Sequence, residues 1–166
     1  MKFVKIKNYV EQSFGGRPSF LLEMSDGKDY ISNGCVFIED TQRNRYRLIS
    51  GCDCGRDLYH LLSAPGIEIQ DLVNADHMFR GCTGLTEFNI DLPRLESANG
   101  MFYYCKSLTG FDSEMPRLKS AKYMFYGCAS LTESDSDLPM LEDATGMLKA
   151  CAGLTEFNSD LPADAG

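Results

Sequence analysis

The sequence lacks the residues and motifs on which most enzyme active sites depend. It contains no tryptophan and only two histidines, His60 and His77. No GxSxG nucleophile elbow, P-loop, HExxH or GxGxxG motif occurs in it, and these motifs are typical of hydrolases, nucleotide-binding enzymes and zinc peptidases. A Cys–His pair can form from residues distant in sequence, but no pattern indicates one. We therefore predict a protein that is not an enzyme and that binds no cofactor.

Long apolar runs are also missing. None approaches the roughly 20 residues that a membrane-spanning helix needs. The first residues, MKFVKIKNYVEQSFGG, lack the uninterrupted apolar core of a signal peptide. We therefore expect no membrane span, and the sequence by itself leaves a cytoplasmic location open.

Basic residues are scarce in the second half of the chain. Of the net charge of −8, residues 1–70 contribute nothing, because nine Lys and Arg balance nine Asp and Glu. Residues 71–166 carry seven basic and fifteen acidic residues, which gives the whole of the −8. Because binding to phosphate backbones needs clustered Lys and Arg, the sequence predicts no nucleic-acid partner.

The number of cysteines excludes complete pairing. With seven in the chain, disulfides within one chain leave at least one thiol over. Four of them recur in single file every 23 residues, which supplies neither the local CxxC pairs nor the His partners of a zinc site. We expect these four to form a column of small buried residues. Cys52 and Cys54 lie near His60, but a CxC pair with one His is a weak metal signal.

The most informative feature is a repeat of 23 residues. Residues 82–93 read CTGLTEFNIDLP, and residues 151–162 read CAGLTEFNSDLP. The same interval, without insertions, aligns four residues in each of several columns: Cys82, Cys105, Cys128 and Cys151; Leu85, Leu108, Leu131 and Leu154; Pro93, Pro116, Pro139 and Pro162. A unit of this length falls within the range of about 20–29 residues found in leucine-rich repeats and below that of ankyrin, TPR or HEAT units.

Each unit combines two periodicities. Apolar residues at i, i+3, i+4 and i+7 predict one face of a short helix, in the second unit Ala98, Met101, Phe102 and Cys105. In LTEFNID, apolar and polar residues are interspersed as in a short strand, and the following Leu-Pro ends that strand because proline cannot donate to a ladder. One such unit cannot bury its apolar side alone, so we expect the copies to stack as a parallel ladder.

The phrase AxxMFxxCxxLT followed by LPxL resembles the BspA-like leucine-rich repeats of bacterial surface proteins, over about residues 72–162. One departure is that two more residues precede LP than in the best-known form of that repeat, while the return segment is shorter. The resemblance implies an α/β fold, a leucine-rich-repeat solenoid of short helices and short parallel strands. It also implies a protein-binding or adhesion module that is secreted or at the cell surface. The alternatives are an intracellular or phage-encoded structural or interaction protein, and a cation-binding repeat module.

The repeat divides the chain into two expected domains. Residues 1–58 show strand-like alternation in KFVKIKNYV and in GCVFIEDTQRNRYRLISGC, around turns at GGRP, SDGKD and TQRN, which predicts a small β-rich domain or cap. Residues 59–166 are expected to form the solenoid, with a degenerate first repeat, DLYHLLSAPGIEIQDLVNA, before about four regular units. No leucine continues the array after Pro162, so we expect an uncapped last repeat that permits end-to-end self-association.

Acidic residues mark the expected outer side of the strands. If Leu85 and Phe88 point inward, positions 87, 89 and 91 point outward. Nine of the twelve such positions in four units are acidic and none is basic: Glu87, Asp91, Asp112, Glu114, Glu133, Asp135, Asp137, Glu156 and Asp160. Three interpretations stay open: a strip that keeps the protein soluble, a binding face for a basic protein partner, and a site for divalent cations, which prefer clustered carboxylates.

Tyrosines form a second candidate surface. Tyr103, Tyr104, Tyr123 and Tyr126 neighbour the apolar Met-Phe pairs of the second and third units. Tyrosine is enriched at protein interfaces, and it also serves as half-buried filler between repeats. The sequence is compatible with both roles.

Overall fold

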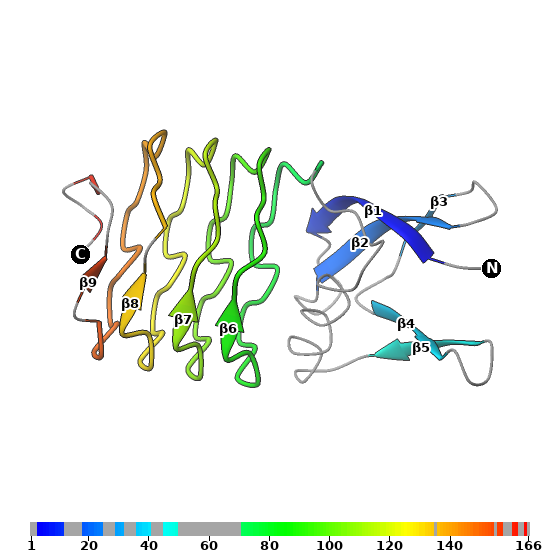
Figure 1. Cartoon of the computed structure of the whole chain (residues 1–166), viewed down its shortest axis with the longest axis horizontal. Helices are drawn as coiled ribbons and strands as arrows, with labels where there is room; N and C mark the ends of the chain where they lie inside the picture. The colour runs from blue at the N-terminus through cyan, green and yellow to red at the C-terminus, as the bar shows by residue number, and fades with distance from the viewer. Residues whose placement is uncertain are drawn as a thin grey trace.

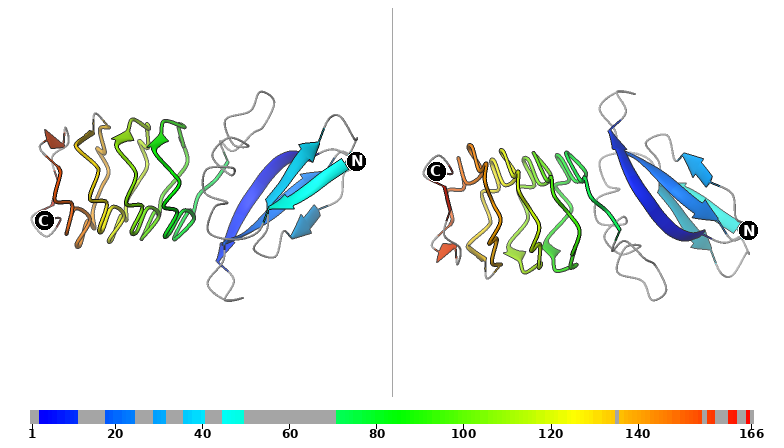
Figure 2. Two further views of the ribbon diagram at one scale, coloured as in Figure 1. Left: turned by 90° about the horizontal axis from the view of Figure 1, so that it is seen from below. Right: turned by 90° about the horizontal axis from the view of Figure 1, so that it is seen from above.

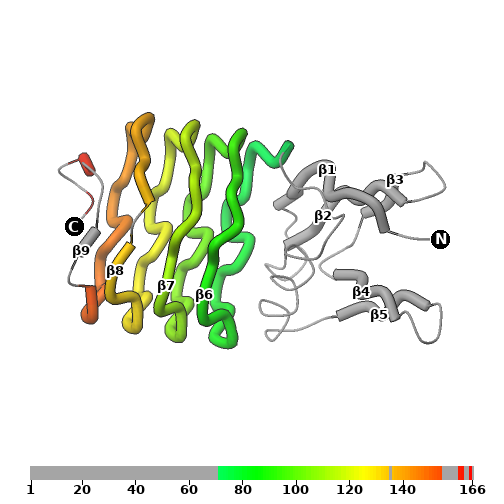
Figure 3. Tube along the Cα trace, viewed as in Figure 1, coloured from blue at the N-terminus to red at the C-terminus, as the bar shows by residue number. Residues whose placement is uncertain are grey.

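The computed structural model describes the chain in two parts. In the N-terminal part it gives the strands β1–β5, and in the second part it describes residues 71–134, 136–154, 156–157, 161–162 and 165. Figure 3 colours most of this second part by residue number.

The N-terminal strands form two small antiparallel sheets. The first has the order β1-β2-β3, with β1 (Phe3–Glu11), β2 (Pro18–Met24) and β3 (Asp29–Ile31). The second pairs β4 (Val36–Asp40) with β5 (Arg45–Ile49). The segment KFVKIKNYV thus contributes to β1, and GCVFIEDTQRNRYRLISGC contains β4 and β5 (Figure 1). The Cys52–Cys54 pair and the expected degenerate repeat as far as residue 70 lie outside the described residues. The last part of that repeat, residues 71–75, is described, and its Leu72 and Ala75 are buried.

The second part contains a four-stranded parallel sheet with the order β6-β7-β8-β9. Its strands are β6 (Glu87–Phe88), β7 (Gly110–Phe111), β8 (Glu133–Ser134) and β9 (Glu156–Phe157). Phe88 pairs with Phe111, and Ser134 pairs with Phe111 and Phe157. The register therefore equals the repeat interval, so each unit makes one coil and successive coils lie side by side (Figure 1). We call this array the repeat stack.

Three segments make up each coil, and we name them by their residues in the second unit. The return segment covers residues 93–99, the turn segment 100–107 and the strand segment 108–115, and the other units follow at intervals of 23 residues. The Leu-Pro turn links a strand segment to the next return segment, as the N–H of Leu95 donates to the carbonyl of Leu92 at 3.2 Å.

The expected short helix is wrong, because turns occupy its place. No helix occurs among the described residues. Gly100 and Tyr104 have φ values of +61° and +58°, which interrupt a right-handed helix. The N–H of Phe102 donates to the carbonyl of Met124 in the next coil at 2.9 Å, and that of Cys105 donates to Phe102 within its own coil at 2.9 Å. Alternate residues thus join neighbouring coils, and the residues between them close turns.

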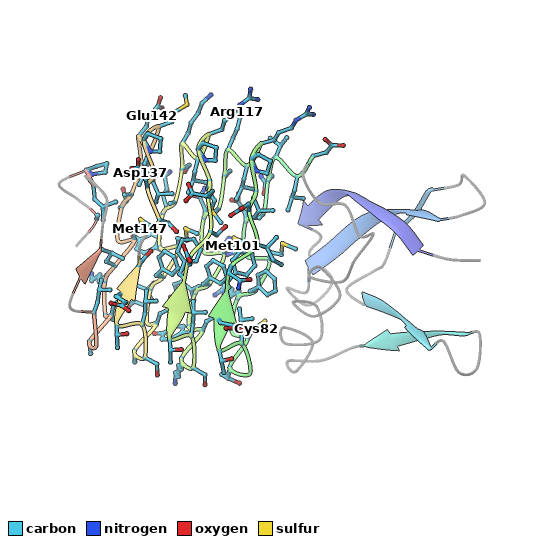
Figure 4. The ribbon with its side chains drawn as sticks, in the orientation of Figure 1. Cys82, Met101, Arg117, Asp137, Glu142 and Met147 are labelled. Carbon is cyan, nitrogen blue, oxygen red and sulfur yellow. The ribbon has the colours of Figure 1, made fainter. Side chains whose placement is uncertain are left out.

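The residues expected on the inner face of that helix are nevertheless the buried ones. Ala98, Met101, Phe102 and Cys105 are fully buried, and Met101 and Met147 are seen inside the stack in Figure 4. An i, i+3, i+4, i+7 pattern identified the inward side correctly but not the backbone conformation. In the second unit, turns with left-handed backbone at residues 100 and 104 direct inward the same four side chains that a helix would have buried.

The strands are shorter than LTEFNID suggested, and in the second and third coils serine side chains take part in the pairing beyond them. In each coil the strand comprises two residues. Two residues after β7, the buried N–H of Ser113 donates to Oγ of Ser136 at 2.9 Å, and the hydroxyl of Ser113 donates to the carbonyl of Ile90. Pairing between coils resumes where the N–H of Leu92 donates to the carbonyl of Glu114 at 3.0 Å.

Two sets of phenylalanines fill the interior between the strand and turn segments. Phe79, Phe102 and Phe125 of successive turn segments stack with centroid distances of 5.7 and 5.5 Å. Phe88 and Phe111 of the strand segments meet this column edge-on, for example Phe88 against Phe102 at 5.0 Å. Each buried ring contributes about 1.5–3 kcal/mol through removal from water. The stack is therefore held by ring contacts between coils as well as within them.

Polar side chains link the return segments. The carboxylate of Asp76 accepts hydrogen bonds from the hydroxyl of Ser97 at 2.6 Å and from the N–H of Asn99 at 2.7 Å in the next coil. Asn99 in turn accepts from Ser120 at 2.7 Å and from the N–H of Lys122 at 2.8 Å. Isolated parallel bridges join the same segments from Asn74 through Ser97 and Ser120 to Asp143.

The last coil is partly covered by the end of the described chain. The N–H of Leu148, whose equivalents donate to the next coil, donates to the carbonyl of Ala165 at 2.8 Å, and Ala165 is buried. Leu141, Leu148 and Cys151 are only half-buried, whereas their equivalents in the third coil are fully buried.

Glycines alternate with rings on the turn segments. Positive φ recurs at two positions per coil, at His77, Gly100, Tyr123 and Gly146, and at Gly81, Tyr104, Gly127 and Ala150. A Cβ on Gly127 would lie 2.6 Å from Cδ1 of Tyr104, and one on Gly146 would lie 2.4 Å from Cε1 of Tyr123. Each of these tyrosine rings therefore lies against the backbone of a glycine in the next coil. Any other residue there would place its Cβ where the ring lies.

We expect Gly127→Ala to destabilise the stack more than Gly81→Ala. Both residues have left-handed φ, +72° and +69°, but a Cβ at Gly81 meets nothing within 4 Å. Gly81→Ala should cost about 1 kcal/mol for backbone strain, and Gly127→Ala about 1 kcal/mol more because the Tyr104 ring must move. Urea unfolding of both variants, with and without Tyr104→Ala, measures the difference. Equal losses at the two glycines would contradict the ring contact.

Candidate binding faces

The strand and turn segments present opposite sides of the repeat stack. Their phenylalanines meet in the interior, where Phe111 contacts Phe125 edge-on at 4.8 Å. Side chains that alternate with these rings therefore point away from each other, to two different surfaces. Figure 2 shows the strands along one long side of the stack and the turns along the other.

The predicted acidic residues that the structure describes are exposed on the strand side. Glu87, Asp91, Asp112, Glu114, Glu133 and Asp137 are all exposed. Asp135, Asp160 and the side chain of Glu156 lie outside the described residues, although the backbone of Glu156 belongs to β9. We call the six described carboxylates, with Asn89, the acidic face. No Lys or Arg occurs in any of the four strand segments.

A groove opens in the middle of the acidic face. It has a volume of about 300 Å³ and is lined by Glu87, Phe88, Asn89, Gly110, Phe111, Asp112, Glu133 and Ser134. Gly110 creates it, because it lacks a side chain at the position that Glu87 and Glu133 occupy in the flanking coils. A Cβ built on Gly110 meets nothing within 4 Å. The groove therefore has carboxylates on both sides and a floor of backbone and buried rings.

Mutual repulsion opposes the concentration of carboxylates on this face. Coils in a parallel ladder lie about 4.8 Å apart, and two like charges about 5 Å apart repel by about 0.8 kcal/mol in water. One carboxylate offsets part of this cost, since Asp91 accepts a hydrogen bond from the N–H of Glu114 at 2.9 Å. The other exposed carboxylates leave the face ready to attract positive charge.

The arrangement of the carboxylates bears on the cation interpretation. Among the described residues, no group of three or more His, Cys, Asp or Glu side chains could hold a metal ion. The six described carboxylates of the acidic face are instead exposed one beside another along neighbouring coils. Such a row suits several basic side chains spread along it better than one ion held by many oxygens.

The four tyrosines form a continuous surface on the turn side. Tyr103 stacks on Tyr126 with a centroid distance of 4.9 Å, and Tyr104 and Tyr123 contact Tyr126 edge-on at 5.5 and 5.9 Å. Tyr104 and Tyr123 are 42% and 43% exposed, while Tyr103 and Tyr126 are half-buried. Tyr103 and Tyr126 are thus placed as half-buried filler between repeats, whereas Tyr104 and Tyr123 are exposed to a potential partner.

Cations accompany these rings. The guanidinium of Arg80 lies 4.9 Å from the ring centroid of Tyr103, and Nζ of Lys106 lies 5.8 Å from that of Tyr104. The nearby Tyr126 raises the pKa of Tyr104. No Asp or Glu occurs in any of the four turn segments. We call Arg80, Tyr103, Tyr104, Lys106, Tyr123 and Tyr126 the tyrosine face.

Sequence reasoning missed three residues of these faces. Gly110 was visible as a gap in an acidic column, but the depth of the groove depends on how closely the coils pack. Arg80 and Lys106 stand at different positions of their units, so no column draws attention to them. Only the contacts of Arg80 with the Tyr103 ring and of Lys106 with the Tyr104 ring show that both cations belong to the same surface as the tyrosines.

The cysteine column is buried in the first three coils, half-buried in the last, and has a structural role. Cys82, Cys105, Cys128 and Cys151 are free thiols. Sγ of Cys105 donates to the carbonyl of Phe79 at 3.0 Å, and Sγ of Cys128 donates to that of Phe102 at 3.1 Å. Burial, and then the neighbouring Cys151, raise the pKa of Cys128 from 9.0 to about 12. Such a protonated thiol is a poor nucleophile and a poor metal ligand.

Comparison of the chain with protein-family models, with curated proteins and with solved structures finds no match. Within the described part of the chain, no helix has the length and apolar character needed to cross a bilayer.

We expect the native thiol of Cys128 to resist alkylation at a pH between 9.0 and about 12, the range between its ordinary and its raised pKa. In this range the unfolded chain loses the thiol proton that the native chain keeps, so the free energy of unfolding falls as the pH rises. Brief iodoacetamide treatment followed by peptide mapping should leave Cys128 unmodified in native protein and modify it in urea. Cys128→Ser should make the loss of stability with pH shallower. Equal alkylation in both states would contradict the burial of this thiol.

Proposed function

We propose that the repeat stack is a non-enzymatic protein-binding module whose acidic face receives Lys or Arg side chains of a partner protein. The observation that carries this proposal is the groove at Gly110, lined by Glu87, Asp112 and Glu133. A long basic side chain can lay its apolar stem along the groove and keep its charge between the flanking carboxylates. Neighbouring coils offer further carboxylates at a constant spacing for further basic side chains.

The proposed fold class is a leucine-rich-repeat solenoid of the BspA-like kind. Support comes from the 23-residue unit and from parallel pairing with a register of one unit. Each coil carries turns where many leucine-rich repeats carry a helix or 3₁₀ turn, so the proposed relationship concerns repeat length and strand pairing. Stacked coils of this kind form a long, repetitive surface that suits protein binding.

The proposed location, by the same resemblance, is the surface of a bacterial cell or its surroundings, with adhesion to another protein or cell as the role. Free cysteines are often taken to indicate a reducing compartment. Here the thiols of Cys105 and Cys128 are fully buried and hydrogen-bonded to main-chain carbonyls. Because oxidants reach exposed thiolates first, these thiols are compatible with an oxidising environment as well.

Removal of charge from the groove should weaken binding to a basic probe. We expect the triple variant Glu87→Gln, Asp112→Asn, Glu133→Gln to bind a lysine- and arginine-rich peptide at least about tenfold more weakly, equivalent to about 1.4 kcal/mol. The control is Asp71→Asn, Glu96→Gln, Glu142→Gln, which removes the same formal charge from the return segments. It also frees Arg94 and Lys119 from their ion pairs, so a smaller loss of affinity in this control is a strict comparison. Of the three control residues, Glu142 lies at the edge formed by the Leu-Pro turns (Figure 4). Calorimetric titration at low and high salt measures both variants.

A second variant tests the shape of the groove without a change in charge. Gly110→Leu should fit, because its Cβ enters open space, and it should fill the groove and weaken peptide binding. If the two triple variants lose affinity equally, and Gly110→Leu binds as the parent does, then binding reflects net charge alone. The proposed site would then be wrong.

A further inference from the structure

We infer that the tyrosine face is a docking surface for the acidic face of a second copy of this chain, so that repeat stacks associate side by side. The inference rests on the proposed function, because it names a partner for the same acidic face. It adds a second binding surface on the opposite side of the stack.

The tyrosine face has the composition of an interface. Tyr104 and Tyr123 are among the most exposed large hydrophobic residues of the repeat stack, and each ring lies against a glycine of the next coil. This contact holds the rings in place before any partner arrives, so little side-chain freedom is lost on docking. Tyrosine with Arg is typical of the residues that contribute most at protein interfaces.

The charges of the two faces are complementary. Strand segments contain no Lys or Arg, and turn segments contain no Asp or Glu. Arg80 and Lys106 lie over tyrosine rings on the turn side. By contrast, Arg94, Lys119 and Lys122 of the return segments form ion pairs with Asp71, Glu96 and Asp143 within the stack. Arg80 and Lys106 are therefore placed, together with the tyrosine rings, to meet carboxylates of another molecule.

The spacing of the two faces is also matched. Both faces belong to the same coils, so their rows repeat at the same distance along the stack. When one copy lies beside another with the axes aligned, every coil of the first can face a coil of the second. One alignment of the two copies then places several carboxylates of one acidic face opposite the rings and cations of the other tyrosine face at the same time. A chemically unrelated basic surface would share this spacing only by coincidence.

The contact joins two different faces, so it does not close on itself. A heterologous interface leaves one unused face at each end of a pair, and further copies can add in the same way. We therefore expect open-ended assemblies whose size rises with concentration. Because exposed charges are screened over about 8 Å at physiological ionic strength, high salt should reduce their size.

A mixing experiment with two variants tests the inference. The first variant carries Glu87→Gln, Asp112→Asn and Glu133→Gln on the acidic face. The second carries Arg80→Gln, Tyr104→Asn and Lys106→Gln on the tyrosine face, where Asn tolerates the left-handed backbone of residue 104. Thermal melting confirms that both fold. Sedimentation velocity of the full chain, up to millimolar concentration at low salt, then measures association.

We expect the parent chain to form assemblies larger than dimers and each variant alone to associate at least tenfold more weakly. An equimolar mixture of the two variants should form a heterodimer and nothing larger, because each supplies the face that the other lacks. A parent chain that stays monomeric would overturn the inference. So would association that survives in both variants, as end-to-end contact through the last coil would give.

The same data separate this inference from the proposed function. If the acidic-face variant loses association while the tyrosine-face variant associates like the parent, the acidic face binds some other surface and only the inference fails. The titration with the basic peptide does not involve the tyrosine face. Its outcome therefore decides the proposed function independently.

Discussion

Main-chain hydrogen bonds between the corresponding segments of neighbouring coils are the interaction on which the rest of the structure depends. On the turn side, the N–H groups of Ala98, Gly100, Phe102 and Tyr104 donate to carbonyls of the next coil at 2.8–2.9 Å. On the strand side, parallel pairs join residues that are one repeat apart. Both ladders must keep the same register around the whole coil, so one residue inserted within a paired segment would misalign the bonds of that coil with its neighbours. This constraint explains why the interval of 23 residues is kept without exception over residues 72–162.

The sequence was sufficient to predict this interval, the parallel register and most of the inward-facing residues, because these follow from periodicity. It was not sufficient for the backbone of the turn segment. A helix and a series of turns bury the same four positions, and what separates them is left-handed φ at residues 100 and 104. Glycine at 100 hints at such a conformation, whereas Tyr104 gives no hint. In this conformation its N–H donates to the carbonyl of Tyr126 in the next coil, a contact that the local sequence does not reveal.

Cysteine and serine complete the ladders where main-chain groups alone do not. The carbonyl of Phe79 accepts from the N–H of Cys82 and from the thiol of Cys105. A thiol suits this place because it is small and apolar enough to be buried and still donates a weak hydrogen bond. On the strand side, the buried serines Ser113 and Ser136 act in a similar way across coils. The repeated cysteine that looks reactive in the sequence is therefore a packing and hydrogen-bonding residue.

Since the interior is fixed by stacking, the outward positions are where coils can differ without loss of the fold. Position 110 shows the consequence, because one glycine among glutamates turns an even row of carboxylates into a groove. Positions 104 and 123 show it again, because a ring at each is accommodated only by a glycine in the following coil. A change at only one member of such a tyrosine–glycine pair leaves either a clash between the ring and a new Cβ or an unfilled space beside the glycine. The groove and the exposed tyrosine rings therefore depend on the order of the coils. Exchanging two units with the same buried residues would preserve the fold but remove the groove and the ring–glycine contacts.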